Sequence, residues 1–115
     1  MTDLEKRSYK FALDTVKLLR LIQSGLVSSV LVRQLIRSST SVGANIAEAK
    51  AGSSKKDFIN FYHHALKSAN ETKYWLSLLH DAGFSKQDDT EPLQDEIDQI
   101  SKILGRSIIT MKGRL

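Results

Sequence analysis

The sequence predicts an all-α fold, a single up-down-up-down antiparallel four-helix bundle. Four amphipathic segments, with apolar residues every three or four positions and three short breaks between them, account for nearly all of the 115 residues. The 6 glycines and 1 proline are too few for a sandwich or barrel, which needs a turn about every 8 to 12 residues. A chain of this length holds one hydrophobic core, so residues 1–115 are expected to form a single domain.

The first helix is expected over roughly residues 4–23. Thr2 and Glu5 have the spacing of a capping box, in which the threonine hydroxyl accepts from a free helical N–H and the glutamate reaches back to the cap. Ser24 and Gly25 follow the last apolar position. Glycine tolerates the left-handed turn with which helices commonly end, so the helix is expected to stop there.

The second helix is expected over roughly residues 27–51. Its stretch from Ser38 to Gly43 is poor in helix formers, because hydroxyl side chains compete for backbone hydrogen bonds and glycine costs about 1 kcal/mol relative to alanine. The apolar spacing nevertheless continues in phase through this stretch, which favours one helix and leaves open a kink within it. The apolar stripe comprises Val27, Val30, Leu31, Leu35, Val42, Ile46 and Ala49.

The third helix is expected over roughly residues 55–82. Ser54 and Asp57 form a second capping box at its start. A seven-residue repeat indicates packing along the whole length of neighbouring helices. The repeat is carried by Phe58, Ala65, Thr72 and Leu79.

The fourth helix is expected over roughly residues 91–112, after a polar loop from Ser85 to Thr90. Pro92 is tolerated in a first helical turn, where its missing N–H would have no intrahelical partner. Acidic residues crowd the start of this segment and basic residues its end, which matches the helix macrodipole at both termini.

No motif in the sequence predicts catalysis. With 0 Cys the chain has no disulfide, thiolate metal site or cysteine nucleophile. The adjacent His63 and His64 point about 100° apart on a helix, and neither belongs to a Glu-x-x-His pair of the kind that binds metals in bundles. Glycine-rich nucleotide loops and nucleophilic serine motifs are also absent. We therefore expect no catalytic residue, metal, cofactor or small-molecule substrate.

A membrane location is not predicted either. No apolar run approaches the roughly 18 residues of a membrane span. The first ten residues are charged where a secretory signal would be apolar. The expectation is a cytoplasmic protein without membrane association.

The charge balance raises the question of an acidic partner. Lys and Arg total 17 against 13 Asp and Glu, a net charge of +4, and the excess is biased toward the first half of the chain. No base-reading motif accompanies it, so nucleic acid would be bound through backbone and shape. The alternative interpretation is that these basic residues only form a solvent-exposed helix face and contact no phosphate. The candidate nucleic-acid contacts are Arg33, Arg37, Lys50, Lys55 and Lys56.

A polar cluster is expected between the second and third helices. Asn45 falls near the apolar stripe, where an unpartnered amide would cost roughly 1 to 3 kcal/mol. Glu48 lies about one turn further along the helix, and Glu71 is a carboxylate of the next one. Asn45, Glu48 and Glu71 are thus predicted to form a structural network, with a binding site as the alternative.

Residues 37–50 read RSSTSVGANIAEAK, and residues 53–58 read SSKKDF. With these two motifs, the segment from Arg37 to about Leu79 resembles the family of four-helix-bundle 23S rRNA intervening-sequence proteins. That family has an Arg-Ser-x-x-Ser-x-x-Ala-Asn-Ile-Ala-Glu stretch followed by a Ser-x-Lys-Asp/Glu-Phe helix start. Gly43 stands where many relatives carry proline, a residue that kinks helices, so the resemblance does not by itself imply a kink at this position. The matching residues are Arg37, Ser38, Ser41, Ala44, Asn45, Ile46, Ala47, Glu48, Ser54, Lys56, Asp57 and Phe58.

The resemblance implies a bundle without established enzymatic activity, similar to members that form homopentameric rings. A related branch, the accessory variability proteins of diversity-generating retroelements, associates with nucleic acid and a reverse transcriptase. We therefore expect a non-enzymatic homo-oligomer, a pentamer by resemblance, that binds structured RNA or DNA nonspecifically. The alternative is a protein-interaction adaptor that uses its small-residue face or Tyr74 and Trp75.

Self-association is also expected from the sequence itself. The apolar faces of the first and fourth helices are wider than a lone bundle needs, so part of them should be buried between subunits. The additional apolar residues are Tyr9, Leu13, Val16, Ile103, Ile108 and Ile109.

Overall fold

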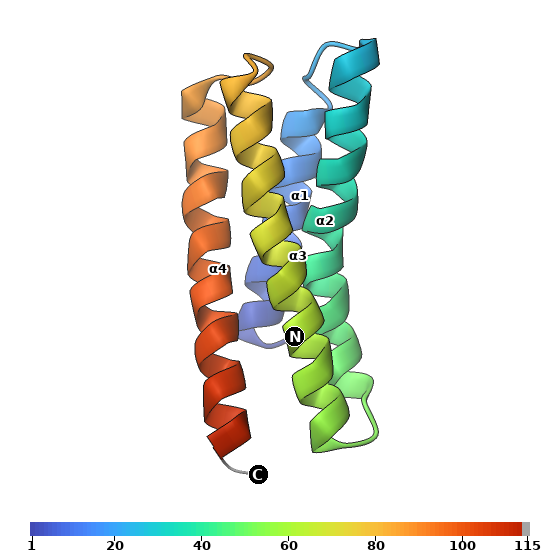
Figure 1. Cartoon of the computed structure of the whole chain (residues 1–115), viewed down its shortest axis with the longest axis vertical. Coiled ribbons are helices and arrows are strands. Elements are labelled where there is room, and N and C mark those ends of the chain that lie inside the picture. The colour runs from blue at the N-terminus through green and yellow to red at the C-terminus, as the bar shows by residue number, and fades with distance from the viewer. Residues whose placement is uncertain (114–115) are drawn as a thin grey trace.

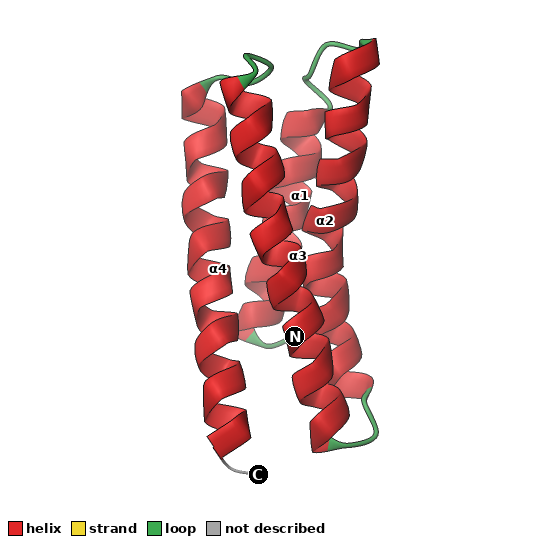
Figure 2. Ribbon diagram, viewed as in Figure 1, coloured by secondary structure: helices red, strands yellow, loops and turns green. Residues whose placement is uncertain are grey.

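The computed structural model describes residues 1–113, which form four helices and no strand. They are α1 (Asp3–Leu19), α2 (Leu26–Ala51), α3 (Lys55–Asp81) and α4 (Gln87–Gly113). Figures 1 and 2 show the helices side by side, with successive helices running in opposite directions. The rod measures 47 × 21 × 21 Å, and each helix packs against its two neighbours around the cycle. The all-α four-helix prediction is confirmed.

The core follows the apolar stripes of the sequence. The largest fully buried aliphatic side chains come from α2, α3 and α4, and Phe11 of α1 completes the set. Burying a side chain of this size contributes about 1.5 to 3 kcal/mol, so these residues dominate the folding energy. The α2, α3 and α4 members are Leu35, Val42, Ile46, Leu76, Leu79, Ile97, Ile100 and Leu104.

Buried hydroxyl groups are a second feature of the core, and the hydrophobic pattern does not show it. Thr15 and Thr72 are fully buried, and each hydroxyl lies within 2.8 Å of a backbone carbonyl one turn earlier in its own helix. This local bond satisfies the hydroxyl without help from a neighbouring helix. Ser8 does the same in α1, where Gly43 of α2 approaches so closely that an added Cβ would lie 3.4 Å from the serine Cβ. Small side chains thus set the α1–α2 distance.

Helix α2 is continuous from Leu26 to Ala51, as the apolar phase favoured. The hydroxyl side chains of Thr40 and Ser41 donate to backbone carbonyls of the preceding turn, at 2.7 Å each. Their competition for backbone groups therefore takes place within the helix and does not break it.

Helix α1 ends at Leu19, four residues earlier than residue 23. Arg20 is the C-cap, and Leu21 and Ile22 donate backbone hydrogen bonds to carbonyls three residues back, so the last turn tightens. The side chain of Ile22 still packs against the core, which explains why its apolar spacing looked helical.

Helix α4 begins at Gln87, four residues before residue 91, so the expected loop from Ser85 to Thr90 is partly helical. The Thr90 hydroxyl is buried, donates to the Lys86 carbonyl at 2.8 Å and lies 2.7 Å from the Ser85 hydroxyl. Asp88 and Asp89 lie in the first turn, where negative charge is favourable. The acidic first turn and the Thr90 hydrogen bond therefore stabilise a helix start here, although the polar composition predicted a loop.

Candidate nucleic-acid interface

The five predicted basic contacts do not share one surface. Arg33 lies in the first third of α2, toward the α1–α2 loop, whereas Lys50 lies 17 residues further along the helix, a rise of about 25 Å. Lys55 and Lys56 begin α3, beside the α2–α3 turn, and both are exposed. The set therefore divides between the two ends of the rod.

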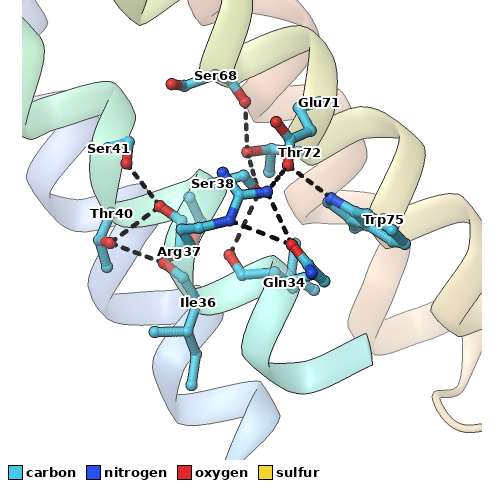
Figure 3. A network of polar contacts seen from close by, with 12 residues as sticks. Gln34, Ile36, Arg37, Ser38, Thr40, Ser41, Ser68, Glu71, Thr72 and Trp75 are labelled. Carbon is cyan, nitrogen blue, oxygen red and sulfur yellow. Dashed lines mark hydrogen bonds and ion pairs between the residues drawn. The ribbon is translucent and has the colours of Figure 1, made fainter. Parts of the chain in front are cut away.

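Arg37 is engaged in a network within the α2–α3 seam (Figure 3). Its guanidinium donates to the Glu71 carboxylate and to the Gln34 side-chain oxygen, the latter at 2.8 Å. The Trp75 indole N–H donates to the same Glu71 carboxylate at 2.9 Å. The charge of Arg37 is thus paired, so this residue is a structural link between the helices.

Two oriented donors act on Glu71. The indole of Trp75, followed by the guanidinium of Arg37, lowers the pKa of the Glu71 carboxyl below its ordinary value of 4.5. The carboxylate form is favoured because both hydrogen bonds go to the charged group. A buried contact lies next to this ion pair, where the Thr72 hydroxyl is hydrogen-bonded to the Ser38 hydroxyl at 3.0 Å. Arg37–Glu71–Trp75 and Ser38–Thr72 together form what we name the seam network.

The predicted cluster of Asn45, Glu48 and Glu71 is not joined by hydrogen bonds in the described part of the chain. The Asn45 amide donates to the Ser41 carbonyl of its own helix at 2.8 Å, which satisfies it without a partner on α3. The Glu48 side chain is exposed and, within residues 1–113, makes no hydrogen bond or ion pair. Asn45 and Glu71 do line the same shallow α2–α3 groove, of about 450 Å³.

Sequence reasoning missed the partners that Glu71 actually has. One signal was available, because Trp75 follows Glu71 by four residues and an indole N–H at that spacing reaches a carboxylate. Arg37 could not be paired with Glu71 without knowing the antiparallel register of α2 and α3.

Four exposed cations without ion pairs lie at the end of the rod that carries the α2–α3 turn, and further exposed cations without ion pairs in residues 1–113, Lys17, Arg20, Arg33 and Lys86, lie toward the opposite end. Lys55, Lys56, Arg106 and Lys112 are all exposed, and none forms an ion pair within residues 1–113. We name these four residues the basic end. In Figure 1 it lies at the lower tips of α3 and α4.

Two acidic groups near the basic end, Glu5 and Asp57, have partners of their own, whereas Glu48 has none within residues 1–113. The Lys50 ammonium lies 3.6 Å from the Glu5 carboxylate, so these two charges offset each other. Asp57 accepts from the Ser53 hydroxyl at 2.8 Å, and its backbone N–H donates to the Ser54 hydroxyl that caps α3. The capping box predicted for this helix start is therefore formed on the serine side.

An open groove separates α3 from α4 beside the basic end. Its volume is about 410 Å³, and its walls include Phe58 and Tyr62 from α3 and Arg106 and Thr110 from α4. The two aromatic rings stack, with centroids 4.6 Å apart and an interplanar angle of 29°. Burial, with the nearby charge of Glu5, raises the pKa of the Tyr62 hydroxyl, so the ring is neutral across the physiological range.

Metal and membrane features were sought in residues 1–113. No group of three or more His, Cys, Asp and Glu side chains in this range could hold a metal ion. None of the helices there is sufficiently long and apolar to span a bilayer.

The chain was compared with known proteins. Residues 2–106 match the family model described as 23S rRNA-intervening sequence protein. A crystal structure at 1.70 Å of a protein of unknown function from the S23 ribosomal protein family of Bacteroides thetaiotaomicron is 37% identical. The match has a TM-score of 0.84 and covers 91% of this chain and 97% of that one. No curated protein matches. Because the family model spans nearly all of the four helices, the chain belongs to the 23S rRNA-intervening sequence protein family.

Proposed function

We propose that this protein is a non-enzymatic, homo-oligomeric bundle that binds structured RNA nonspecifically through the basic end. The observation that carries this is that Lys55, Lys56, Arg106 and Lys112 lie at one end without ion pairs in residues 1–113, beside a groove lined by two stacked aromatic rings. Cations that are not already neutralised can replace the counterions of backbone phosphates, whereas Arg37 cannot do so without losing Glu71. Phosphate contacts carry no sequence information, hence the expected lack of specificity.

The test is a filter-binding titration against structured rRNA fragments at 50 and 200 mM salt. Neutralising about four phosphates predicts that affinity falls by roughly 100-fold over this range. Binding that is undetectable, or that does not respond to salt, would remove the proposal. A double-stranded DNA of equal length serves as the comparison, because backbone recognition predicts that it binds in the same salt-dependent way.

Self-association is supported by two apolar faces on opposite sides of α2. On the α1 side, Tyr9, Leu13 and Ile36 are 62%, 41% and 40% exposed. On the α3 side, Val30 and Tyr74 are 50% and 62% exposed. Two different faces favour a heterologous contact, in which one face of a subunit meets the other face of the next, and such contacts form a ring where the rotation between subunits closes. Ile108, expected from the sequence to join subunits, is instead buried within the single chain.

Light scattering at tens of micromolar checks the assembly. The wild type is expected to be an oligomer, a pentamer by family resemblance, and Leu13→Asp is expected to dissociate it because a charge would be buried in the contact. Ile109→Asp is the matched control. The sequence alone placed Ile109 between subunits, but it is 73% exposed on α4, which does not adjoin α2 and so lies outside both proposed faces. A wild-type monomer, or dissociation by the control alone, would contradict the ring.

An adaptor function is the second candidate. It is favoured by Tyr74, which is exposed and packs edge-to-face against Trp75 with ring centroids 5.0 Å apart. Exposed aromatic residues of this kind commonly anchor protein partners. Pull-down from nuclease-treated lysate separates the two functions, because a directly bound protein survives nuclease and an RNA-bridged one is lost.

A further inference from the structure

The groove between α3 and α4 combines features that two other surface grooves, one between α1 and α2 and one between α2 and α3, have only separately. The α1–α2 groove near the loop has Arg20 and Arg33 but no aromatic ring. The α2–α3 groove contains Phe61 and Lys67, yet the guanidinium and indole beside it are committed to the seam network. Of these three grooves, the α3–α4 groove alone joins an ordered aromatic pair to a guanidinium that is in no ion pair within residues 1–113.

The aromatic pair is positioned before any ligand arrives. Phe58 and Tyr62 are one turn apart on α3, both are half-buried, and Tyr62 packs against the core. Their stacked rings therefore lose little side-chain freedom on binding. A nucleobase can stack on such a surface whatever its identity, because every base has a π-face.

The opposite wall supplies polar groups. Arg106 is exposed, and its Nε–H is hydrogen-bonded to the Lys102 carbonyl at 3.4 Å, which leaves the terminal nitrogens free to donate. Thr110 follows one turn later on the same side of α4, and the Ser107 hydroxyl also lines the groove. A guanidinium with nearby hydroxyls can donate to a phosphate and to ribose oxygens.

We propose that this groove holds one unpaired nucleotide of the bound RNA strand, its base against Phe58 and Tyr62 and its phosphate toward Arg106. The inference rests on the proposed RNA binding and adds where the strand enters. Lys55 and Lys56 precede Phe58 by less than one turn, so the phosphates adjoining that nucleotide meet the rest of the basic end. The volume of about 410 Å³ is within the usual range for small-ligand sites.

The test compares two RNAs with the same number of phosphates, a blunt duplex and a shorter duplex with unpaired nucleotides at one end. Fluorescence anisotropy at about 100 mM salt is expected to show roughly tenfold tighter binding of the RNA with unpaired nucleotides. Phe58→Leu and Tyr62→Leu should each remove most of that preference and leave the blunt-duplex affinity unchanged. Tyr74→Leu is the matched control, an aromatic residue of the same helix outside the groove, and should keep the preference. Circular dichroism verifies that each variant is folded.

The outcomes separate the two proposals. If neither RNA binds, both are overturned. If both RNAs bind equally well, and the leucine variants bind as the wild type does, the groove assignment alone is overturned. Adenosine 5′-monophosphate is titrated in parallel. Micromolar binding of this free nucleotide, without any preference for unpaired RNA, would overturn the assignment to a strand.

Discussion

The seam network and the groove beside the basic end contain the same kinds of side chain, an arginine and aromatic residues. In the seam they are hydrogen-bonded to a carboxylate, and in the groove, within the described residues, they are not. In the seam, Arg37 and Trp75 both direct their donors at Glu71, so the cation and the aromatic residue hold α2 to α3 (Figure 3). At the basic end, Arg106 and the Phe58–Tyr62 pair face an open groove without a carboxylate partner. The comparison teaches that an arginine near an aromatic residue is structural where a carboxylate joins them and available for ligands where none does.

The largest expected effect comes from reversing charge at the basic end. The double substitution Lys55→Glu and Lys56→Glu should lower RNA affinity by about 100-fold at low salt, because two phosphate contacts become repulsive. Stability should be unchanged or slightly higher, since both positions are in the first turn of α3 and acidic residues are favourable there. Filter binding and thermal unfolding measure the two effects.

The matched control makes the same change of net charge at the other end of the rod, as Lys17→Glu and Arg20→Glu. Both residues are exposed near the end of α1. Its RNA affinity should fall by severalfold at most. An equal loss in both variants would show that the whole surface, and not the basic end, attracts RNA.

The intermediate effect concerns the buried part of the seam network. Thr72→Val keeps the shape of the side chain but removes the hydroxyl that bonds Ser38, so the free energy of unfolding should fall by about 1 to 2 kcal/mol. RNA affinity should be unchanged. Urea unfolding measures the loss, with Thr40→Val as the control, because Thr40 also bonds a carbonyl of its own helix but is exposed. Equal losses in the two variants would mean that the contact with Ser38 contributes nothing.

The smallest effect is a pH dependence. Glu71→Gln should cost about 0.5 kcal/mol at pH 7, because the pair with Arg37 is partly exposed. The pKa of Glu71 is lowered in the folded state, so its stabilisation is present above 4.5, the ordinary value, and is lost as pH falls through the folded pKa. Below that pKa the wild type and Glu71→Gln should be equally stable.

The 1 tryptophan of the chain reports the same titration. Trp75 emission should change as Glu71 is protonated, at a pH below 4.5, and this change should be absent from Glu71→Gln. A wild-type emission curve that is flat through this interval would show that the indole does not contact the carboxylate in solution.

Much of the fold could be predicted because local signals agreed. Apolar residues in helical phase located the four helices, and the capping serine and threonine marked the starts of α3 and α1. The same reasoning placed Val27 and Val30 in the core, whereas they are 61% and 50% exposed. Their positions continue the apolar spacing of α2, but Ser28 and Leu31 are the residues turned inward at that level. Periodicity identified a helix there without fixing which side of it meets the neighbours.

Of the candidate site, only Lys55 and Lys56 were predicted from the sequence. Lys55 and Lys56 are exposed at the basic end as the local charge pattern suggested, and Arg106, which lies about 50 residues away in the chain, joins them because α3 and α4 are antiparallel neighbours.

By itself, the sequence determined that this chain forms four amphipathic helices, because helical period and end-capping depend on residues within a few positions of one another. Tertiary structure alone decided that Arg37 is neutralised by Glu71 and that Arg106 is not, and also that Phe58, Tyr62 and Arg106 line one groove. The physical reason is that ion pairing and groove formation depend on the register between helices. Side chains from all along the core set that register jointly when they pack.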